Sequence, residues 1–122
     1  MDIESIREHC LGLREVTEDM PFGPDTLVFR IYNKIFACID LTRPDRIALK
    51  CDPERAIELR ERYRGIEGAW HWNKRFWNDV YFESDVPDTL IRELVEHSLH
   101  EVLRKLPVRV QREYAAAGND KP

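Results

Sequence analysis

The stretch LVFRIYNKIFACIDL, residues 27–41, is the feature that most constrains the fold of this chain. Side chains that favour β-structure alternate over two runs, and Asn33 and Lys34 lie between the runs. The alternation has the two-residue period of a β-strand, and Asn tolerates the positive φ of a tight hairpin turn. We therefore predict two antiparallel strands joined by a two-residue turn at Asn33-Lys34.

Further strands and helices follow from the same kind of pattern. The turn sequence Thr42-Arg43-Pro44-Asp45 precedes RIALK, which predicts a third strand of a meander. AWHWN and NDVYF predict two more strands, joined by a turn at KRFW. Apolar residues recur at helical spacing in four segments, and Asp2, Asp52 and the sequence Asp85-Val86-Pro87-Asp88 are interpreted as caps. The predicted helices cover residues 2–13, 53–64, 89–106 and 107–114.

The order of these elements indicates the fold class. One helix, three strands, one helix, two strands and two helices are typical of an α+β fold, with helices packed on one face of an antiparallel sheet. The length of 122 residues suits one domain with its own core. We predict a single domain over residues 1–114 and a frayed tail at 115–122.

The segment TEDMPFGPDT, residues 17–26, separates the first helix from the hairpin. Its two prolines and its glycine restrict the backbone strongly. A stiff loop of this length is a candidate functional loop. The alternative is a plain connection that packs Phe22 onto the core.

Charge and cysteine content exclude several classes of protein. The net charge of −4, with a slight basic excess only within residues 25–82, argues against a generic polycationic nucleic-acid binder. Cys10, Cys38 and Cys51 show no CxxC spacing, which argues against a disulfide framework and a zinc knuckle. The N-terminus lacks a signal-peptide pattern and no apolar run approaches a membrane span. We expect a cytoplasmic monomer without a membrane partner.

Catalytic and metal-binding patterns are weak in this chain. Neighbouring helical residues such as His9 and Cys10 point in different directions, and no glycine-rich phosphate loop is present. The EHSLHE sequence, residues 96–101, has the spacing of a metal site on one helical face. Apolar side chains fill the opposite side of that helix, so we interpret the His and Glu side chains as its solvated face. We predict no catalytic residue, no metal and no cofactor.

The segment AWHWNKRFWNDVYF, residues 69–82, contains all three tryptophans and allows two interpretations. In one it is a nucleic-acid surface, where Lys74 and Arg75 contact phosphate and an exposed Trp stacks on a base. In the other its aromatic and apolar side chains form the buried face of a hairpin, namely Trp70, Trp72, Val80 and Phe82. We favour burial of the tryptophans and assign the functional interest to the polar positions His71, Asn73, Lys74 and Asn78.

Four segments of the chain match a known pattern. They are PFGPDTLVFRI, ALKCDPERAIELRERY, the H-x-N-K-x-x-W-N pattern from His71 to Asn78, and DVPDTLIRELVEHSLHEVLRKLP. In this order they resemble the MmcQ/YjbR family of small bacterial proteins over nearly the whole chain. Trp72 departs from the pattern, in which that position is more often Met-like. The resemblance implies a CyaY-like fold with a double-wing arrangement that is often labelled DNA-binding, and it implies no reaction and no catalytic residues.

On this basis we predict a non-catalytic DNA-binding protein. Its wings are the hairpins around Asn33-Lys34 and around Lys74-Arg75. The alternative is a small-ligand or protein-binding module, in which the PFGP loop and the turn at residues 71–78 frame a pocket. An enzyme that uses His71 as an acid or base is third. The predicted nucleic-acid contacts are Arg30, Lys34, Arg43, Arg46, Lys50, His71, Asn73, Lys74, Arg75 and Asn78.

Overall fold

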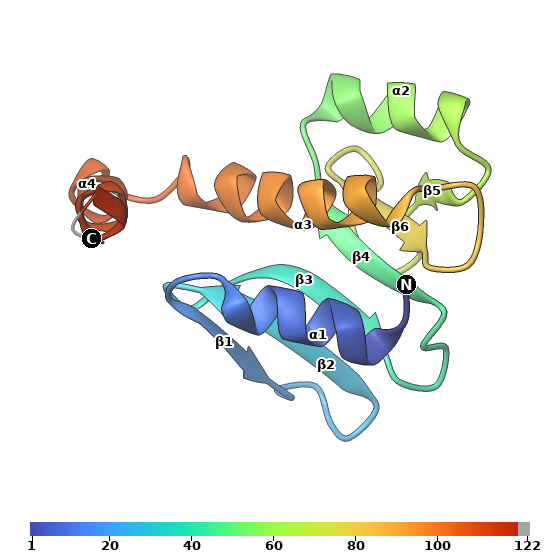
Figure 1. Ribbon diagram of the computed structural model, residues 1–122, viewed down its shortest axis with the longest axis horizontal. Helices are drawn as coiled ribbons and strands as arrows, with labels where there is room; N and C mark the ends of the chain where they lie inside the picture. Colours follow the sequence, from blue (N-terminus) through green and yellow to red (C-terminus); the bar gives the residue numbers. More distant parts are fainter. Residues whose placement is uncertain (120–122) are drawn as a thin grey trace.

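The computed structural model describes residues 1–119, which form an antiparallel sheet and four helices (Figure 1). The six strands have the order β1-β2-β3-β4-β6-β5, and every neighbouring pair is antiparallel. The predicted α+β class is therefore confirmed. The strands are β1 (Val16–Asp19), β2 (Thr26–Ile31), β3 (Lys34–Asp40), β4 (Arg46–Lys50), β5 (Ile66–Gly68) and β6 (Trp77–Tyr81). The helices are α1 (Ile3–Gly12), α2 (Pro53–Arg62), α3 (Asp88–Leu103) and α4 (Val108–Asn119).

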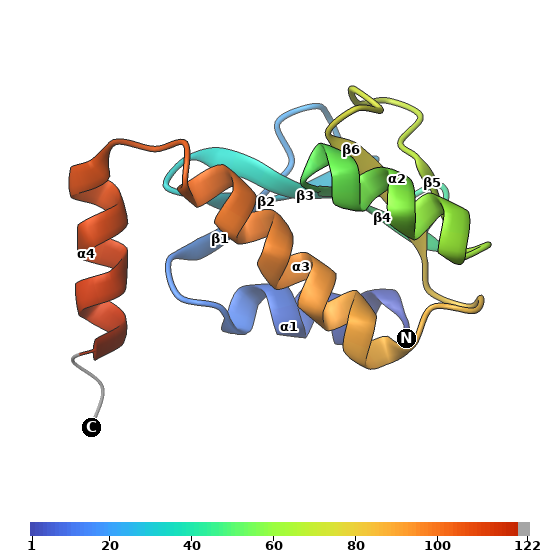
Figure 2. The same ribbon diagram turned by 90° about the horizontal axis from the view of Figure 1, so that it is seen from above.

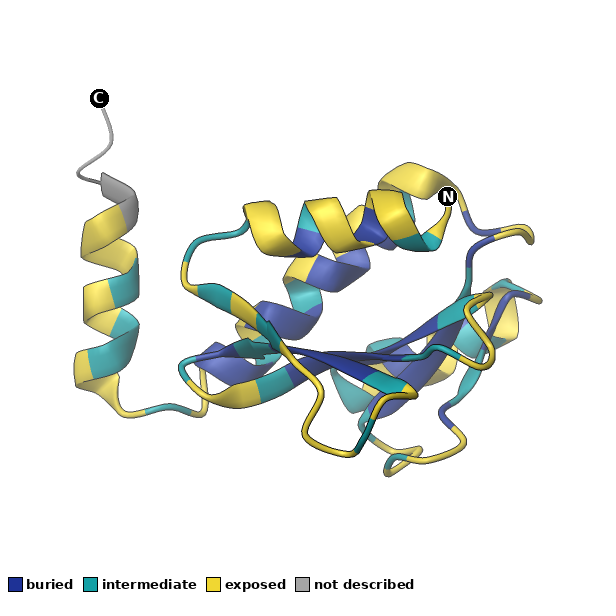
Figure 3. Ribbon diagram, turned by 90° about the horizontal axis from the view of Figure 1, so that it is seen from below, coloured by how far each residue is buried: buried dark blue, intermediate teal, exposed yellow. Residues whose placement is uncertain are grey.

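Helices α1, α2 and α3 pack on the same face of the sheet, as predicted. Figure 2 shows α1 and α3 together on that face. Apolar side chains of all three helices join those of the strands in one core, and Figure 3 shows the buried residues concentrated between helices and sheet. The largest fully buried side chains of this core include Phe29, Phe36, Ile39, Ile47, Ile91 and Leu99. We call this side of the sheet the helix face and the other side the loop face.

Local capping signals account for two of the helix starts. Asp2 accepts a hydrogen bond from the Ser5 N–H at 2.8 Å, and Asp52 accepts one from the Arg55 N–H at 3.1 Å. Both predicted caps are therefore confirmed. Helix α3 has Pro87 at its N-cap, and no side chain of the predicted capping sequence Asp85-Val86-Pro87-Asp88 caps it, so that predicted cap is wrong. Asp85 instead accepts the Arg64 and Gly65 N–H groups, which follow α2.

The hairpin turn lies one residue earlier than predicted. Tyr32 has a φ of 46° and Asn33 a φ of 68°, whereas Lys34 is already the first residue of β3. A two-residue turn with positive φ at both central positions matches the right-handed twist of the strands it joins. Asn33 has the positive φ that the sequence predicted, and Tyr32 is the other turn residue with a positive φ.

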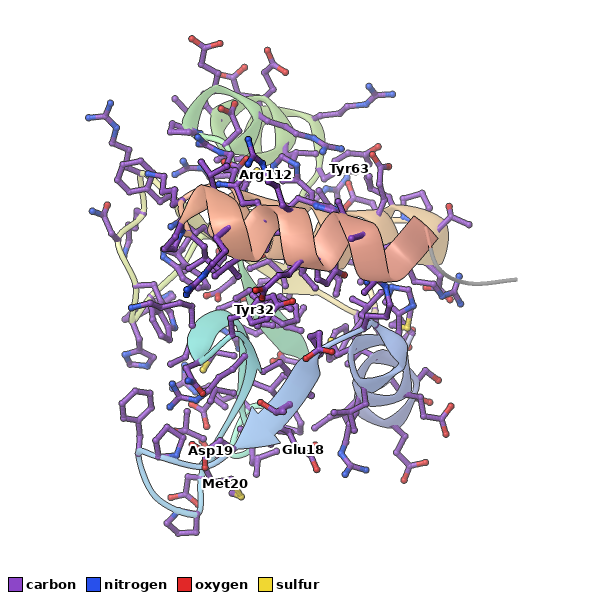
Figure 4. All side chains as sticks on the ribbon, turned by 90° about the vertical axis from the view of Figure 1, so that its left-hand side faces the viewer. Glu18, Asp19, Met20, Tyr32, Tyr63 and Arg112 are labelled. Carbon is purple, nitrogen blue, oxygen red and sulfur yellow. The ribbon has the colours of Figure 1, made fainter. Side chains whose placement is uncertain are left out.

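Strand β1 was not predicted, because the polar sequence VTED lacks a β-pattern. It pairs with β2 at the edge of the sheet, from Val16 opposite Ile31 to Asp19 opposite Val28. The loop 20–25 follows it, and Figure 4 shows Met20 at the end of this strand. Phe22 is 63% exposed, so the interpretation of this loop as a connection that packs Phe22 onto the core is wrong.

The first of the two strands predicted from the tryptophan-rich segment is also displaced. Strand β5 ends at Gly68, and residues 69–76 form a loop before β6. A Cβ atom at Gly68 would lie 3.2 Å from Lys74 Cβ, so the glycine allows the loop to return close to the strand. Trp70 is 67% exposed, and its predicted burial is wrong. Trp77 is buried and stacks on the half-buried Trp72 at 4.5 Å between ring centroids.

Ser98 of α3 joins the two halves of the sheet. Strands β3 and β4 pair at Ala37–Leu49 and Cys38–Ala48. Beyond this pairing, the buried Ser98 hydroxyl donates to the Phe36 carbonyl at 2.5 Å and accepts the Lys50 N–H at 2.8 Å. The side chain thus satisfies backbone groups at the point where the strand ladder ends.

Helix α4 lies at one end of the molecule and runs beyond its predicted end at Tyr114 (Figure 1). Its Tyr114 ring meets Tyr32 edge-to-face at 6.3 Å, and Arg14 lies 4.1 Å from the same ring. Figure 4 shows Tyr32 beneath this helix. The predicted frayed tail falls partly on α4, and its residues 120–122 lie outside the described part of the chain. Within residues 1–119, no helix is both long and apolar enough to span a membrane.

A candidate ligand pocket on the loop face

The loop face of the sheet carries a second, smaller apolar cluster. Val28, Cys38 and Ala48 from three adjacent strands pack there with Ala69 and Trp77. The loops 20–25 and 69–76 both project on this side, away from α1 and α3 (Figure 2). This face is therefore covered by loops rather than helices, and part of it stays open.

A pocket of about 50 Å³ opens beside this cluster. Its floor comes from three strands in register, where Cys38 of β3 is opposite Ala48 of β4, and Ala48 is opposite Asp79 of β6. The small side chains of Cys38 and Ala48 leave room above the sheet. The remaining lining residues are Asp40, Arg43 and Arg46 from β3, β4 and their connection, and Trp70, His71 and Trp72 from the loop 69–76.

Asp79 is the least expected residue of this pocket. It is only 6% exposed, and its Oδ2 accepts one hydrogen bond, from the Trp70 N–H at 3.3 Å. Its Oδ1 accepts no hydrogen bond from the described residues. Burial raises the pKa of this carboxyl, because the charged form loses hydration that a single long hydrogen bond replaces poorly. Asp79 is thus a largely buried carboxylate on the pocket floor, and its Oδ1, which is not among the fully buried atoms without a partner, remains accessible from the pocket.

The positive charge at the pocket wall is partly neutralised. Arg46 forms an ion pair with Asp45 at 2.8 Å and lies over the Tyr81 ring at 4.6 Å. Tyr81 in turn donates to Glu67 at 2.7 Å, and burial together with this bond raises the pKa of Tyr81 to about 12. Arg43 is exposed and forms no ion pair with a carboxylate of residues 1–119. The wall can therefore offer one free guanidinium group.

His71 lies at the rim, close to two carboxylates of the pocket. Asp40 accepts the Thr42 hydroxyl at 2.6 Å and the Thr42 N–H at 2.9 Å, and these bonds lower the pKa of Asp40, with a smaller contribution from His71. His71 also interacts electrostatically with Asp79. A titratable imidazole and two carboxylates with opposite pKa shifts therefore share one small pocket.

Three of the ten predicted nucleic-acid contacts, Arg43, Arg46 and His71, line this pocket. Three others are used inside the protein. Arg30 pairs with Asp19 at 3.4 Å and donates to the Asn33 carbonyl at 3.0 Å. Lys74 donates to the Ala69 carbonyl at 3.0 Å, and Asn73 accepts the Arg75 N–H at 3.0 Å within the loop.

Asn78 lies on the opposite side of the sheet from the pocket. It is 2% exposed and donates to the Ala56 carbonyl of α2 at 3.3 Å, so its side chain does not reach the surface. Lys34 is exposed at the start of β3. Lys50 and Arg75 lie near Phe76, away from the pocket lining. The ten predicted contacts are therefore distributed over both faces of the sheet and are not gathered on one surface.

Asp40, Asp79, Trp70 and Cys38 were missed as pocket residues by sequence reasoning. One signal for Asp79 was available, because a carboxylate within the β-sequence WNDVY is unusual for a strand with both faces covered. No comparable signal identifies Trp70, because the sequence pattern predicts it inside a strand. Its exposure follows from the early end of β5.

The EHSLHE stripe has structural contacts in addition to its solvated positions. His97 is half-buried, and its Nε2 accepts the Asp52 N–H at the start of α2 at 3.2 Å. Burial lowers the pKa of His97, which keeps this nitrogen free to accept. Arg55 pairs with Glu93 at 3.0 Å beside it. Among residues 1–119, no three His, Cys, Asp or Glu side chains are placed to hold a metal ion.

Fold and pocket together define a class of small α+β protein with an open antiparallel sheet, helices on one face and a loop-lined pocket on the other. The YjbR family model matches residues 11–100, so the chain belongs to the YjbR family. The predicted family resemblance is thus confirmed.

Relatives of this chain come from several bacteria. The Escherichia coli O157:H7 protein YbdF, named as an uncharacterized protein, is 33% identical over 92% of this chain and 96% of its own length. YjbR of Escherichia coli K12, also named as uncharacterized, is 24% identical over 88% of this chain and 92% of its own. The crystal structure of the Deinococcus radiodurans protein DR2400, with a DUF419 domain, is 33% identical. It superimposes with a TM-score of 0.85 over 93% of this chain and 88% of that chain. A crystal structure from Pseudomonas syringae, 26% identical, has a TM-score of 0.70 over 80% and 96%.

Proposed function

We propose that this protein is a binding module for a small polar ligand, held in the pocket on the loop face. The observation that carries this proposal is Asp79, a carboxylate at 6% exposure with one long hydrogen bond and a free Oδ1. A buried charge with so few partners costs stability unless something else uses it. A ligand that donates hydrogen bonds to Asp79 supplies the missing partners.

The lining residues specify the chemistry of this ligand. Asp79 on the floor calls for an N–H donor or a cationic nitrogen. Trp70 at the rim is 67% exposed and offers a flat surface on which a planar ring can stack. The volume of about 50 Å³ accommodates only a few heavy atoms, so the pocket holds one end of the ligand. A planar group with amine, amidine or amino-heterocycle donors fits all three conditions.

Nucleophilic catalysis in the same pocket is less well supported than binding. Burial raises the pKa of Cys38 to about 11, so its sulfur stays a protonated thiol near neutral pH. A proton-transfer role for His71 stays a narrower hypothesis, supported by its place beside Asp40 and Asp79. Ligand binding requires only the residues that already line the pocket, and we therefore rank it above catalysis.

A thermal-shift screen of the full chain tests the proposed function. Amines, amidines, aminopurines and nucleosides are the compounds to screen, because a ligand of the native state raises the melting temperature. We expect at least one hit whose binding is lost in Asp79→Asn and weakened in Trp70→Ala. Glu58→Gln, an exposed carboxylate on α2, is the matched control and is expected to bind like the wild type.

Two results of this screen would contradict the proposed function. A screen without hits in any of these classes, or a hit that Asp79→Asn binds as tightly as the wild type, contradicts the proposal. Retained binding in Asp79→Asn with loss in Glu58→Gln would place the ligand elsewhere on the molecule.

DNA binding stays a second candidate for this chain. The observation in its favour is that Lys34, Arg43 and Arg75 are exposed and form no ion pair with the described residues. The neutralised Arg30 and Arg46 and the buried Asn78 count against it. An anisotropy titration with duplex and single-stranded oligonucleotides at low and moderate salt tests it, because phosphate contacts weaken as salt rises. Absence of binding at low salt rejects it.

A cytoplasmic location stays part of this proposal. Its support is that Cys10, Cys38 and Cys51 are all buried free thiols. Unpaired cysteines are usual in reducing compartments, where disulfides rarely persist.

A further inference from the structure

Phe76 lies between positively charged side chains from separate parts of the chain. The Arg75 guanidinium carbon is 5.4 Å from the centroid of the Phe76 ring, and Lys105 Nζ is 5.7 Å from it. Lys105 follows α3, whereas Arg75 belongs to the loop 69–76. Both cations therefore lie within reach of one half-buried aromatic ring.

Lys50 at the end of β4 joins this group. The next residue, Cys51, donates its N–H to the Phe76 carbonyl at 2.7 Å, and Lys50 itself is opposite Trp77 in the sheet. Lys50 is half-buried, and burial lowers its pKa, with a further contribution from the nearby charge of Lys105. Lys50 thus lies within electrostatic range of Lys105, and Lys105 and Arg75 both lie against the Phe76 ring. We call these three residues the cationic cluster.

The cationic cluster lacks a carboxylate partner within residues 1–119. None of its three side chains forms an ion pair there, and the nearby Glu101 is engaged by Arg104 through two hydrogen bonds of 2.9 and 3.1 Å. Most other ion pairs of the protein are made by Arg side chains that have a carboxylate close by, such as Arg46 with Asp45. Lys50 and Lys105 repel one another, and an added anion relieves this repulsion.

Favourable contacts explain only part of this arrangement. The carbonyl groups at the end of α3 attract Lys105, and the Phe76 ring attracts a cation weakly. Neither effect accounts for the half-buried Lys50. Desolvation and the charges of Lys105 and Arg104 oppose its ionised form, and the charge of Glu101 offsets them only in part, so the pKa of Lys50 is lowered. We infer that Lys50, Arg75 and Lys105 form a binding site for a phosphate group, carried either by a phosphorylated small molecule or by a nucleic-acid backbone.

This site is separate from the pocket of Asp79. None of the three cationic residues lines that pocket, so either proposal can fail without the other. Two of the three, Lys50 and Arg75, are among the contacts predicted from sequence, and Lys105 is new. The chemistry shared by both ligand sources is a phosphate oxyanion whose oxygens several Lys and Arg side chains can share.

Binding of pyrophosphate and of a single-stranded oligonucleotide to the full chain tests this inference. Calorimetry or NMR titration at low salt is expected to detect at least one of the two ligands, with affinity that falls as salt rises. The double variant Arg75→Gln/Lys105→Gln is expected to lose on the order of tenfold in affinity. The matched control Arg92→Gln/Arg112→Gln removes two exposed cations of α3 and α4 and is expected to change affinity by less than about twofold.

The two ligands also separate the two sources. Binding of pyrophosphate that competes with the oligonucleotide indicates a site for the phosphate group itself, whereas oligonucleotide binding alone indicates that a longer backbone is needed. The inference is overturned if neither ligand binds, if the double variant binds as the wild type does, or if the control loses as much. Circular dichroism and melting temperature of each variant exclude a loss of fold.

Discussion

Two buried polar side chains on opposite faces of the sheet differ in how their hydrogen bonds are satisfied. On the helix face, the buried Ser98 hydroxyl makes two good hydrogen bonds to the backbone of β3 and β4. On the loop face, the buried Asp79 carboxylate makes one long bond to Trp70. A buried polar group with a purely structural role normally makes all of its hydrogen bonds within the protein. A buried group that leaves an acceptor unpaired is more typical of a binding site. Asn78 Oδ1 on the helix face also lacks a partner, but it is enclosed in the core, whereas Asp79 borders the pocket on the loop face, where a ligand is expected.

The helix face also buries larger apolar side chains than the loop face does. The helix face holds large, fully buried side chains such as Phe29 and Leu99. The loop face holds a smaller cluster of Val28, Cys38, Ala48, Ala69 and Trp77, and both Trp70 and the loop residue Phe22 are exposed. Large buried side chains supply most of the hydrophobic stabilisation, so mutations should affect the two faces unequally.

The same substitution on the two sides tests this difference most strongly. Phe29→Ala is expected to lower the free energy of unfolding by about 3–5 kcal/mol, because it leaves a cavity in the helix-face core. Phe22→Ala in the exposed loop is expected to change it by less than about 0.5 kcal/mol. Urea unfolding of both variants measures the contrast, and similar losses would contradict the division between the faces.

A second pair of substitutions compares the buried and the exposed tryptophan of the segment 69–82. Trp77→Ala is expected to lower the free energy of unfolding by about 3 kcal/mol, because Trp77 is buried and stacks on Trp72. Trp70→Ala is expected to lower it by less than about 0.5 kcal/mol. The emission maximum of Trp70 should also be that of a solvated indole. A large loss from Trp70→Ala would mean that this side chain is packed.

Ser98→Ala tests how far the fold depends on the hydroxyl between β3 and β4. Its loss leaves the Phe36 carbonyl and the Lys50 N–H without partners in a buried place, which is expected to lower the free energy of unfolding by about 1–3 kcal/mol. Hydrogen exchange of the Lys50 amide should accelerate. Ser5→Ala on the exposed face of α1 is the control, and equal losses in both variants would show that the bridge contributes nothing special.

Asp79→Asn is expected to have a small effect on stability, with the opposite sign to the buried substitutions above. Folding raises the pKa of Asp79, so its contribution to stability is fully present below the unfolded pKa and is lost as pH rises through the folded value. At neutral pH the amide removes a buried charge, and the free energy of unfolding should rise by up to about 1 kcal/mol. This gain should disappear in acid, as melting curves over a pH series will show.

Asp40→Asn provides the reversed control within the same pocket. Hydrogen bonds from Thr42 lower the pKa of Asp40, so its contribution to stability is present above the unfolded pKa and is lost as pH falls. The variant should be less stable than the wild type near neutral pH and equal to it in strong acid. If the stability of both Asp variants depends on pH in the same way, Asp79 is not a buried carboxylate with a raised pKa.

Local signals in the sequence predicted most of the elements correctly. The caps at Asp2 and Asp52, the alternation in β2 and β3, and the apolar period of α3 all act within a few residues. The errors fall where a distant segment decides the outcome. Strand β1 exists because β2 offers it an edge, and β5 stops at Gly68 because the returning loop packs against it.

The sequence by itself determined the α+β class, the helices on one face and the family, because these depend on periodicity, capping and motif order along the chain. Only the tertiary structure decided which side chains meet. Asp79 becomes a buried acceptor because Cys38 and Ala48 of neighbouring strands are small and the loop 69–76 closes over them. Burial and electrostatic environment are properties of residues far apart in sequence, and they exist only once the sheet has assembled.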